Sequence, residues 1–183
     1  EKDFRDESDD NSRLSALYID ALDRKRHVSG RVGRQSRSTG GVLGRFDGGL
    51  FSYQPYSPVT VNLVAGYPVT SSTDTSINDD KHFYGLSFDL GTFMEHWNFN
   101  TFIINQEVDG ISDRQAVGGE TRYFDAYRSF FSLVDYDISY NELNLILFVG
   151  NWTFSDKTTF NMSLDYRKSP ILMTSNALQG QGV

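Results

Sequence analysis

Hydrophobic and polar residues alternate with a period of two along much of this chain. In YGLSFDLGTF (84–93), the large apolar residues Tyr84, Leu86, Phe88 and Leu90 occupy every second position, and small or polar residues lie between them. Successive side chains of a β-strand point to opposite faces of the sheet. The stretch therefore predicts a strand with one apolar and one polar face.

The same pattern, read together with turn-forming residues, predicts ten strands, and helical periodicity is weak throughout. Alternation is also clear in VTVNLVAGYPV (59–69) and TFNMSLDYR (159–167), whereas the segment 142–154 is apolar on both faces at its centre. The expected strands are 12–23, 27–37, 42–54, 59–69, 82–93, 97–108, 115–124, 129–138, 142–154 and 158–168.

The connections between these strands are expected to alternate in length. Five short turns are expected at 24–25, 55–58, 94–96, 125–128 and 155–157. Longer connections are expected at 38–41, 70–81 and 109–114, while the eighth connection, 139–141, is short and departs from this alternation. Strands of about ten residues joined by short turns on one side and longer loops on the other are typical of outer-membrane β-barrels.

Composition removes several classes of protein from consideration. The chain has 183 residues, 38% of them hydrophobic and 14% aromatic, which indicates a folded domain rather than a disordered chain. A net charge of −7 argues against nucleic acid as a partner, and the lack of cysteine excludes disulfides and a cysteine nucleophile. The longest nearly apolar run, Leu143–Gly150, is far shorter than the roughly 20 residues of a membrane-spanning helix.

Alternation alone does not separate a membrane barrel from a soluble β-sandwich, because a sandwich strand also has one buried and one solvated face. The alternative is a secreted or periplasmic β-sandwich that binds glycans through surface aromatics. Three features favour the barrel: the scarcity of lysine, strands longer than those of ordinary sheets, and aromatic residues such as Trp97 and Trp152 near strand ends.

Four segments of the sequence resemble the porin-like β-barrel portion of Gram-negative outer-membrane proteins: 29–54, 113–125, 133–144 and 164–170. The resemblance covers most of the chain from about residue 12. It implies an all-β fold, an antiparallel up-and-down transmembrane β-barrel, located in the bacterial outer membrane. Outer-membrane lipid and small solutes are the partners that it implies.

The expected organisation is an acidic N-terminal segment (1–11) followed by a β-barrel domain (12–183). The first residues lack an initiator Met and an apolar leader, so we expect a mature product or a piece of a longer chain. The chain ends in NALQGQGV rather than in the aromatic-terminated strand usual for such barrels, so we expect a segment of a larger barrel. A homo-oligomer and an upstream periplasmic domain are both compatible with this organisation.

Charged residues on the polar faces of the strands are the candidate site. Arginines and carboxylates facing each other across a lumen would create a transverse field that filters solutes. The alternative is that they form ion pairs that hold the barrel wall, with nearby glycines marking bulges. The candidate lumen residues are Arg31, Arg34, Arg45, Asp47, Asp89, Glu120, Arg122 and Asp165.

No residue pattern predicts catalysis, so we do not expect an enzyme. His82 lies near Ser87 in sequence, but nothing orients such a pair, and no histidines have the spacing of a metal site. We expect no cofactor. The expected function is a porin-like passive channel or an envelope anchor with a polar, charged lumen. In such a barrel, a charge introduced at Leu86 should disrupt folding, whereas Ser87 should tolerate one.

Overall fold

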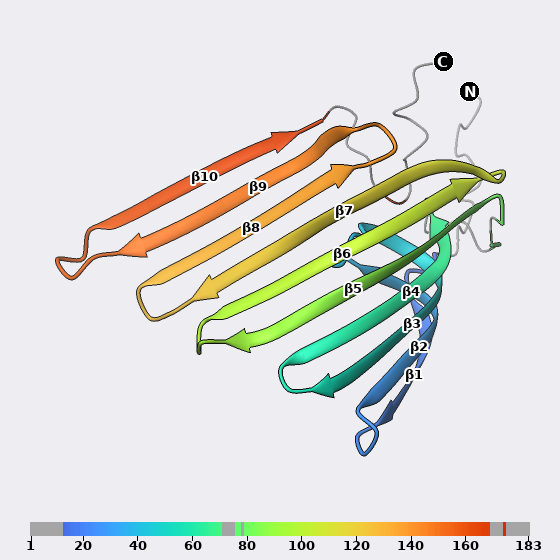
Figure 1. Ribbon diagram of the computed structural model, residues 1–183, viewed down its shortest axis with the longest axis horizontal. Helices are drawn as coiled ribbons and strands as arrows, with labels where there is room; N and C mark the ends of the chain where they lie inside the picture. The colour runs from blue at the N-terminus through green and yellow to red at the C-terminus, as the bar shows by residue number, and fades with distance from the viewer. Residues whose placement is uncertain (1–12, 71–75, 78, 169–173, 175–183) are drawn as a thin grey trace, which may run out of the picture.

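The computed structural model describes residues 13–70, 76–77, 79–168 and 174, and these residues form one antiparallel sheet. Ten strands follow each other in sequence order, so every strand pairs with its neighbours along the chain (Figure 1). No helix occurs among the described residues. The predicted all-β, up-and-down arrangement of ten strands is therefore confirmed.

Most strand boundaries lie within two residues of the predicted ones, except at the starts of the first and seventh strands. The strands are β1 (Leu17–Asp23), β2 (Val28–Arg37), β3 (Gly44–Tyr56), β4 (Val59–Val69), β5 (Lys81–Phe93), β6 (Trp97–Val108), β7 (Ile111–Phe124), β8 (Arg128–Asp137), β9 (Glu142–Thr153) and β10 (Thr159–Arg167).

The connection between β6 and β7 differs from the prediction of a long loop at 109–114. It is a two-residue turn, Asp109–Gly110, in which both residues have positive φ angles, 52° and 75°. Asp-Gly is a favoured pair for tight hairpins because both positions tolerate that conformation. The strand β7 consequently begins at Ile111, and the connections that exceed the turns in length are 38–43 and 70–80.

The described sheet is open. The strands β1 and β10 lie at its two edges, and the register contains no pairing between them. Figure 1 shows that the sheet curls, with β1–β4 bent away from the plane of β6–β10. A closed barrel is therefore not what the described strands form.

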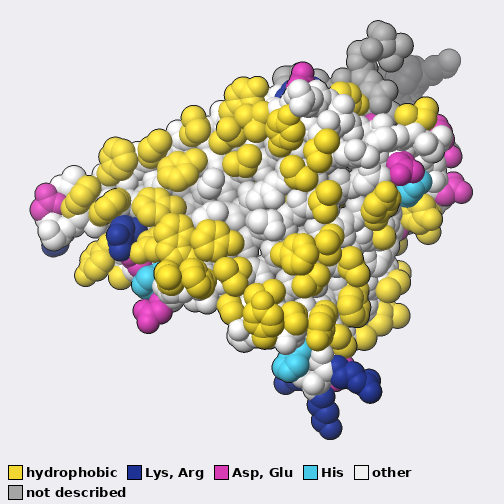
Figure 2. Space-filling view, viewed as in Figure 1, with side chains coloured by type: hydrophobic (Ala, Val, Ile, Leu, Met, Phe, Trp, Pro, Cys, Tyr) yellow, Lys and Arg dark blue, Asp and Glu magenta, His cyan; other side chains and the backbone are white. Residues whose placement is uncertain are grey.

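The register divides the side chains into two faces. We call the apolar face the one that carries Leu63, Leu86 and Ile103, which lie opposite one another on β4, β5 and β6. We call the polar face the one that carries their neighbours Asn62 and Ser87, which also lie opposite one another. On the face of β5–β10 seen in Figure 2, hydrophobic side chains cover the centre and charged side chains gather at the margins.

A small hydrophobic core lies on the polar face, beneath the segment 38–43 that joins β2 to β3. Val42 from this segment is fully buried, and Phe46 meets Phe83 edge-on with ring centroids 5.2 Å apart. The segment therefore folds over the sheet instead of extending beyond its edge. The core consists of Val42, Phe46, Val64, Phe83, Ile104 and Ala116.

Candidate functional site

The centre of the polar face holds a hydrogen-bonded group of side chains around Asp89. Its two carboxylate oxygens each accept a hydrogen bond of 2.5 Å, one from the Asn62 amide and one from the Asn100 amide. The Asn62 amide nitrogen also lies 3.2 Å from the hydroxyl of Ser87. Three neighbouring strands, β4, β5 and β6, supply these side chains, because Asn62 stands opposite Ser87 and Asn100 stands opposite Asp89.

Charged side chains of both signs surround this group. Glu120 on β7 is buried and pairs with Arg122 at 3.0 Å, and Arg37 at the end of β2 donates to the Ser87 hydroxyl at 3.3 Å. Arg37 is within electrostatic range of both Asp89 and Glu120. Together with Asn62, Ser87, Asp89 and Asn100, these residues form what we call the Asp89 cluster.

A cavity of about 110 Å³ opens within the Asp89 cluster. The oxygen of the Asn100 amide is buried there without a hydrogen-bond partner among the described residues. Such a volume accommodates a few water molecules or a small polar group. The cavity is lined by Thr39, Asp89, Asn98, Phe99, Asn100, Glu120 and Arg122.

A second group of polar side chains lies at the end of the sheet where the segment 38–43 is attached. Arg114 and Asp135 form an ion pair of 2.5 Å, and neither side chain is exposed. Asn144 donates to the other oxygen of Asp135 at 3.2 Å, and Arg114 donates to the carbonyl oxygen of Gly41 at 3.2 Å. The ion pair thus links the wall of the sheet to the segment that covers it.

Glycines allow the segment 38–43 to lie this close to the sheet. Gly40 and Gly41 have φ angles of 64° and 78°. A Cβ atom on Gly41 would lie 2.4 Å from the ring of Phe102, and one on Gly40 would lie 2.9 Å from the hydroxyl oxygen of Ser87. A side chain at either position would therefore force the segment away from the polar face.

Ser87 is consequently a poor site for a charge, contrary to the expectation from its alternation. It is 3% exposed, in contact with the covering segment and within the Asp89 cluster. Alternation identifies the face on which a residue lies, but it carries no information about a loop that packs on that face.

The structure divides the eight candidate lumen residues into separate groups. Asp89, Glu120 and Arg122 lie together in the Asp89 cluster. Arg31 pairs with Asp20 at 2.6 Å across β1 and β2. Asp165 pairs with Arg167 at 2.7 Å on the exposed strand β10.

The remaining three candidates, Arg34, Arg45 and Asp47, lie on the apolar face. Arg34 and Asp47 stand opposite each other on β2 and β3, form an ion pair of 2.7 Å, and are flanked by Tyr67. Arg45, two residues before Asp47, belongs to the same apolar face by alternation. The structure therefore does not bring these three residues together with Asp89.

Three charged residues of the polar face were not among the candidates: Arg37, Arg114 and Asp135. Arg37 follows Arg31, Gly33 and Gln35 at intervals of two, so its face could have been assigned from alternation. Asp135 likewise alternates with the apolar residues of its strand. The partner of Asp135 was not accessible from the sequence, because Arg114 meets it across β7 and β8.

An aromatic rim borders the short-turn end of the apolar face. The ring centroids of Trp97 and Tyr123 are 4.7 Å apart, and those of Tyr123 and Phe130 are 5.6 Å apart. The guanidinium of Arg128 lies over both Tyr123 and Trp152, at 5.3 and 5.4 Å from the ring centroids. We define the aromatic rim as Trp97, Phe99, Tyr123, Phe130 and Trp152.

The turn beside this rim holds an unusually acidic carboxyl group. The hydroxyl of Tyr123 donates to Asp125 at 2.6 Å, and this bond is the main cause of a pKa far below the usual value for aspartate. The Arg128 guanidinium and the backbone amides of Tyr127 and Arg128 also donate to it and lower the pKa further. Asp125 therefore remains ionised and fixes the turn between β7 and β8.

Within the part of the chain that the structure describes, no three His, Cys, Asp or Glu side chains are grouped as metal ligands. Over the same residues, no helix is long and apolar enough to cross a membrane. A comparison of the chain with models of protein families, with curated proteins and with solved structures finds no match. Function is therefore inferred from the geometry of the sheet.

Proposed function

We propose that this chain forms the wall of a β-barrel in the bacterial outer membrane and acts as a porin-like passive channel for small polar solutes. The apolar face meets lipid and the polar face lines the lumen. One observation carries the proposal: burial is the reverse of that in a soluble sheet. Ile19, Val32 and Leu63 are 78%, 68% and 53% exposed, whereas Arg114 and Asp135 are fully buried.

In water the exposed apolar face is unfavourable, because soluble monomers rarely expose large continuous apolar surfaces. A glycan-binding β-sandwich would instead bury Leu63 and its neighbours between two sheets. In a bilayer the apolar face needs no protein cover, and polar residues inside a barrel bond to one another or to lumen water.

The dimensions and borders of the sheet support the same proposal. Apart from β1, the strands are 9–14 residues long, compared with about 9–11 for strands that cross a bilayer at a tilt. The aromatic rim lies at one end of the apolar face, where an interfacial girdle of Trp and Tyr is expected.

A barrel in lipid must be closed, because unpaired backbone groups are costly in the hydrocarbon region. The proposal therefore requires partners for β1 and β10. In β10, Phe160, Met162 and Leu164 face one way, and Asn161 and Ser163 face the other. The edge strand β10 thus has the two-faced pattern of the inner strands, so it is suited to pair with another strand.

The contents of the polar face favour a channel over a simple anchor. The Asp89 cluster combines arginines and carboxylates around a small cavity, and the segment 38–43 narrows the space in front of it. Solutes that pass the Asp89 cluster would replace hydrogen bonds to water with hydrogen bonds to fixed dipoles and to charges of both signs. We expect small polar solutes to pass and large ones to be excluded.

The test is expression with an outer-membrane leader, followed by fractionation, gel migration and conductance measurement. We expect the protein in the outer-membrane fraction, faster migration before boiling than after it, and discrete conductance steps in planar bilayers. A monodisperse monomer without detergent would overturn the barrel in favour of the soluble sandwich. Membrane insertion without conductance would leave the anchor and overturn the channel.

A further inference from the structure

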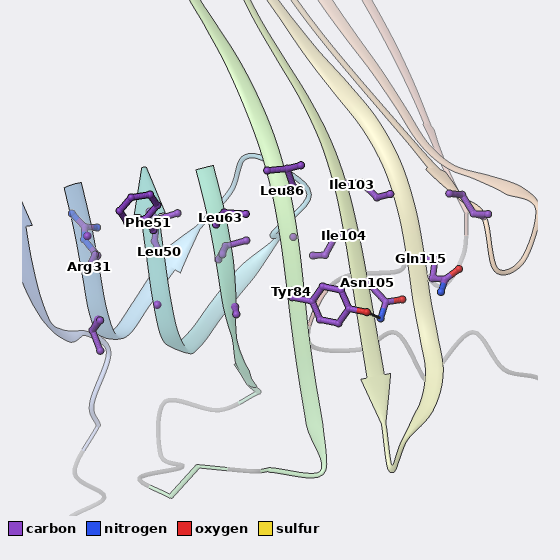
Figure 3. A pocket seen from close by; sticks show the side chains of 17 residues that line it. Arg31, Leu50, Phe51, Leu63, Tyr84, Leu86, Ile103, Ile104, Asn105 and Gln115 are labelled. Carbon is purple, nitrogen blue, oxygen red and sulfur yellow. Dashed lines mark hydrogen bonds between the residues drawn. The ribbon is translucent and has the colours of Figure 1, made fainter. Parts of the chain in front are cut away.

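The apolar face contains a trough that runs across the strands from β2 to β6. Its walls are two rows of side chains, and its floor is the backbone of the residues between them (Figure 3). The register builds the first row from Phe51, Leu63, Leu86 and Ile103, which stand side by side on β3–β6. The volume of the trough is about 870 Å³.

Small residues in the second row open the trough. Gly49 and Ala65 stand side by side on β3 and β4, between Val32 and Tyr84. On β2, the residue opposite Phe51 is Gly30, so the first row has no side chain there. The trough is therefore a gap between the large side chains of the apolar face.

The fold does not require glycine at these places. A Cβ atom on Gly30 or Gly49 would meet only one backbone oxygen, at 3.9 Å, and neither residue has a positive φ. By contrast, a Cβ atom on the adjacent Gly48 would lie 2.2 Å from the carbonyl oxygen of Ala65. Glycine within a strand weakens it and often marks a place where a ligand approaches the backbone.

One end of the trough is polar. The Asn105 amide donates to the Tyr84 hydroxyl at 2.9 Å, and Gln115 lies beside Asn105 on β7 (Figure 3). Because the Tyr84 hydroxyl accepts this bond, its own proton is free to be donated. The oxygen of the Asn105 amide is buried without a partner among the described residues.

We propose that the trough binds one acyl chain of a membrane lipid, with an ester carbonyl oxygen of the lipid accepting a hydrogen bond from the Tyr84 hydroxyl. The inference rests on the proposed membrane location of the apolar face. The trough is continuous with that face, and its volume lies in the usual range of small-molecule sites, roughly 300–1,000 Å³. Five strands at a spacing of about 4.8 Å give it a length of roughly 19 Å, which suits an extended chain.

The test uses purified protein reconstituted in phosphatidylethanolamine and phosphatidylglycerol vesicles. A trace of phosphatidylcholine carries a photoactivatable diazirine in one acyl chain, and labelled residues are mapped by mass spectrometry after irradiation. We expect several times more label on Phe51, Leu63, Leu86 and Ile103 than on Phe160 and Leu164 of β10. The β10 residues face the same way but lie outside the trough.

Two variants that fill the trough, Gly49→Leu and Gly30→Val, should reduce label on its walls to the level of β10. The matched control is Ser132→Leu, which adds the same side chain to the apolar face of β8, away from the trough. It should leave the labelling pattern unchanged. Heat-modifiable gel migration serves as the check that each variant is folded.

The outcomes separate the two proposals. Suppose the folded protein enters vesicles but is labelled evenly over the apolar face, and Gly49→Leu and Gly30→Val have no effect. This result would overturn the acyl-chain site and leave the barrel in place. Protein that does not enter vesicles would overturn the barrel and the acyl-chain site together. Loss of wall label in Ser132→Leu as well would overturn the assignment to the trough.

Discussion

At the residue scale, the ion pair of Arg114 and Asp135 is fully buried on the polar face, so both charges are removed from water. Removing a charge from water is costly, and the pair offsets this cost only while both partners and their additional hydrogen bonds are present. Arg114 also bonds to Gly41, and Asp135 also bonds to Asn144. The loss of one partner therefore leaves a buried charge and weakens the attachment of the covering segment.

We predict that Asp135→Leu or Arg114→Met alone lowers the free energy of unfolding by about 3–5 kcal/mol. The double variant should be less destabilised than the sum of the two single variants, because it leaves no unpaired charge. Urea unfolding in detergent micelles measures both effects.

The matched control is Arg167→Ala, which removes an exposed ion pair with Asp165. Exposed pairs contribute roughly 0–1 kcal/mol, so this variant should unfold close to the wild-type urea concentration. Equal destabilisation by Arg167→Ala and Asp135→Leu would contradict the assigned role of burial.

Asp125 gives the turn between β7 and β8 a defined dependence on pH. Its pKa is lowered in the folded protein, chiefly by the hydroxyl of Tyr123. The stability that it contributes is therefore complete above the unfolded value of about 3.9 and is lost as the pH falls toward the folded value. The turn should thus resist mild acid.

We predict that Asp125→Asn speeds hydrogen exchange at the amides of Tyr127 and Arg128, which donate to the carboxylate. After correction for intrinsic exchange, the difference from wild type should be constant above about pH 4 and should shrink at lower pH. Asp156→Asn changes another turn carboxylate and should leave these two amides unaffected. A difference that grows in acid would contradict the assignment.

At the scale of single elements, the segment 38–43 is the part of the fold that covers the polar face, and in the proposed channel it would limit passage. It is held by the backbone of Gly41, the buried side chain of Val42 and the close contact of Gly41 with Phe102. A small displacement of this segment would uncover the Asp89 cluster.

We predict that Gly41→Ala raises the single-channel conductance, because the added methyl group would displace the segment from Phe102. Gly110→Ala is the control, since Gly110 also has a positive φ but a Cβ atom there meets no atom within 4 Å. An unchanged conductance in folded Gly41→Ala protein would show that the segment does not limit passage.

The strand β10 allows the two faces to be compared at adjacent positions. Leu164 belongs to the apolar face and Ser163 to the polar face, and both are exposed in the described sheet. We predict that Leu164→Arg costs about 2–4 kcal/mol of stability in a bilayer, whereas Ser163→Arg is close to neutral. Folding yield into lipid vesicles, measured by heat-modifiable migration, would reveal the contrast, and similar losses in both variants would contradict it.

The sequence was sufficient to predict the strands but not what packs on them. Alternation placed all ten strands, because a period of two is a local property of the chain. Alternation does not locate the start of β7, because Asp109–Gly110 lies in a polar, turn-forming run that equally predicts a longer loop. The contact of Arg114 with Gly41 joins residues 73 positions apart, and no local pattern encodes such a contact.

At the scale of the whole molecule, the described sheet has two chemically different faces, and its edge strands β1 and β10 are not paired with each other. The eight charged residues expected to line one lumen are distributed over both faces, with Asp89 on one and Asp47 on the other. Alternation along β2 already places Arg34 with Val32 and apart from Arg31, and the register adds that Arg34 stands opposite Asp47.

The aromatic rim has a spectroscopic consequence. The chain has two tryptophans, Trp97 and Trp152, and both belong to the rim at the short-turn end. In the proposed barrel, tryptophan fluorescence would therefore report the depth of the rim in the bilayer at one membrane interface only. We predict stronger quenching by lipids brominated near the head group than by lipids brominated near the end of the acyl chain. The opposite order would place this rim in the bilayer centre.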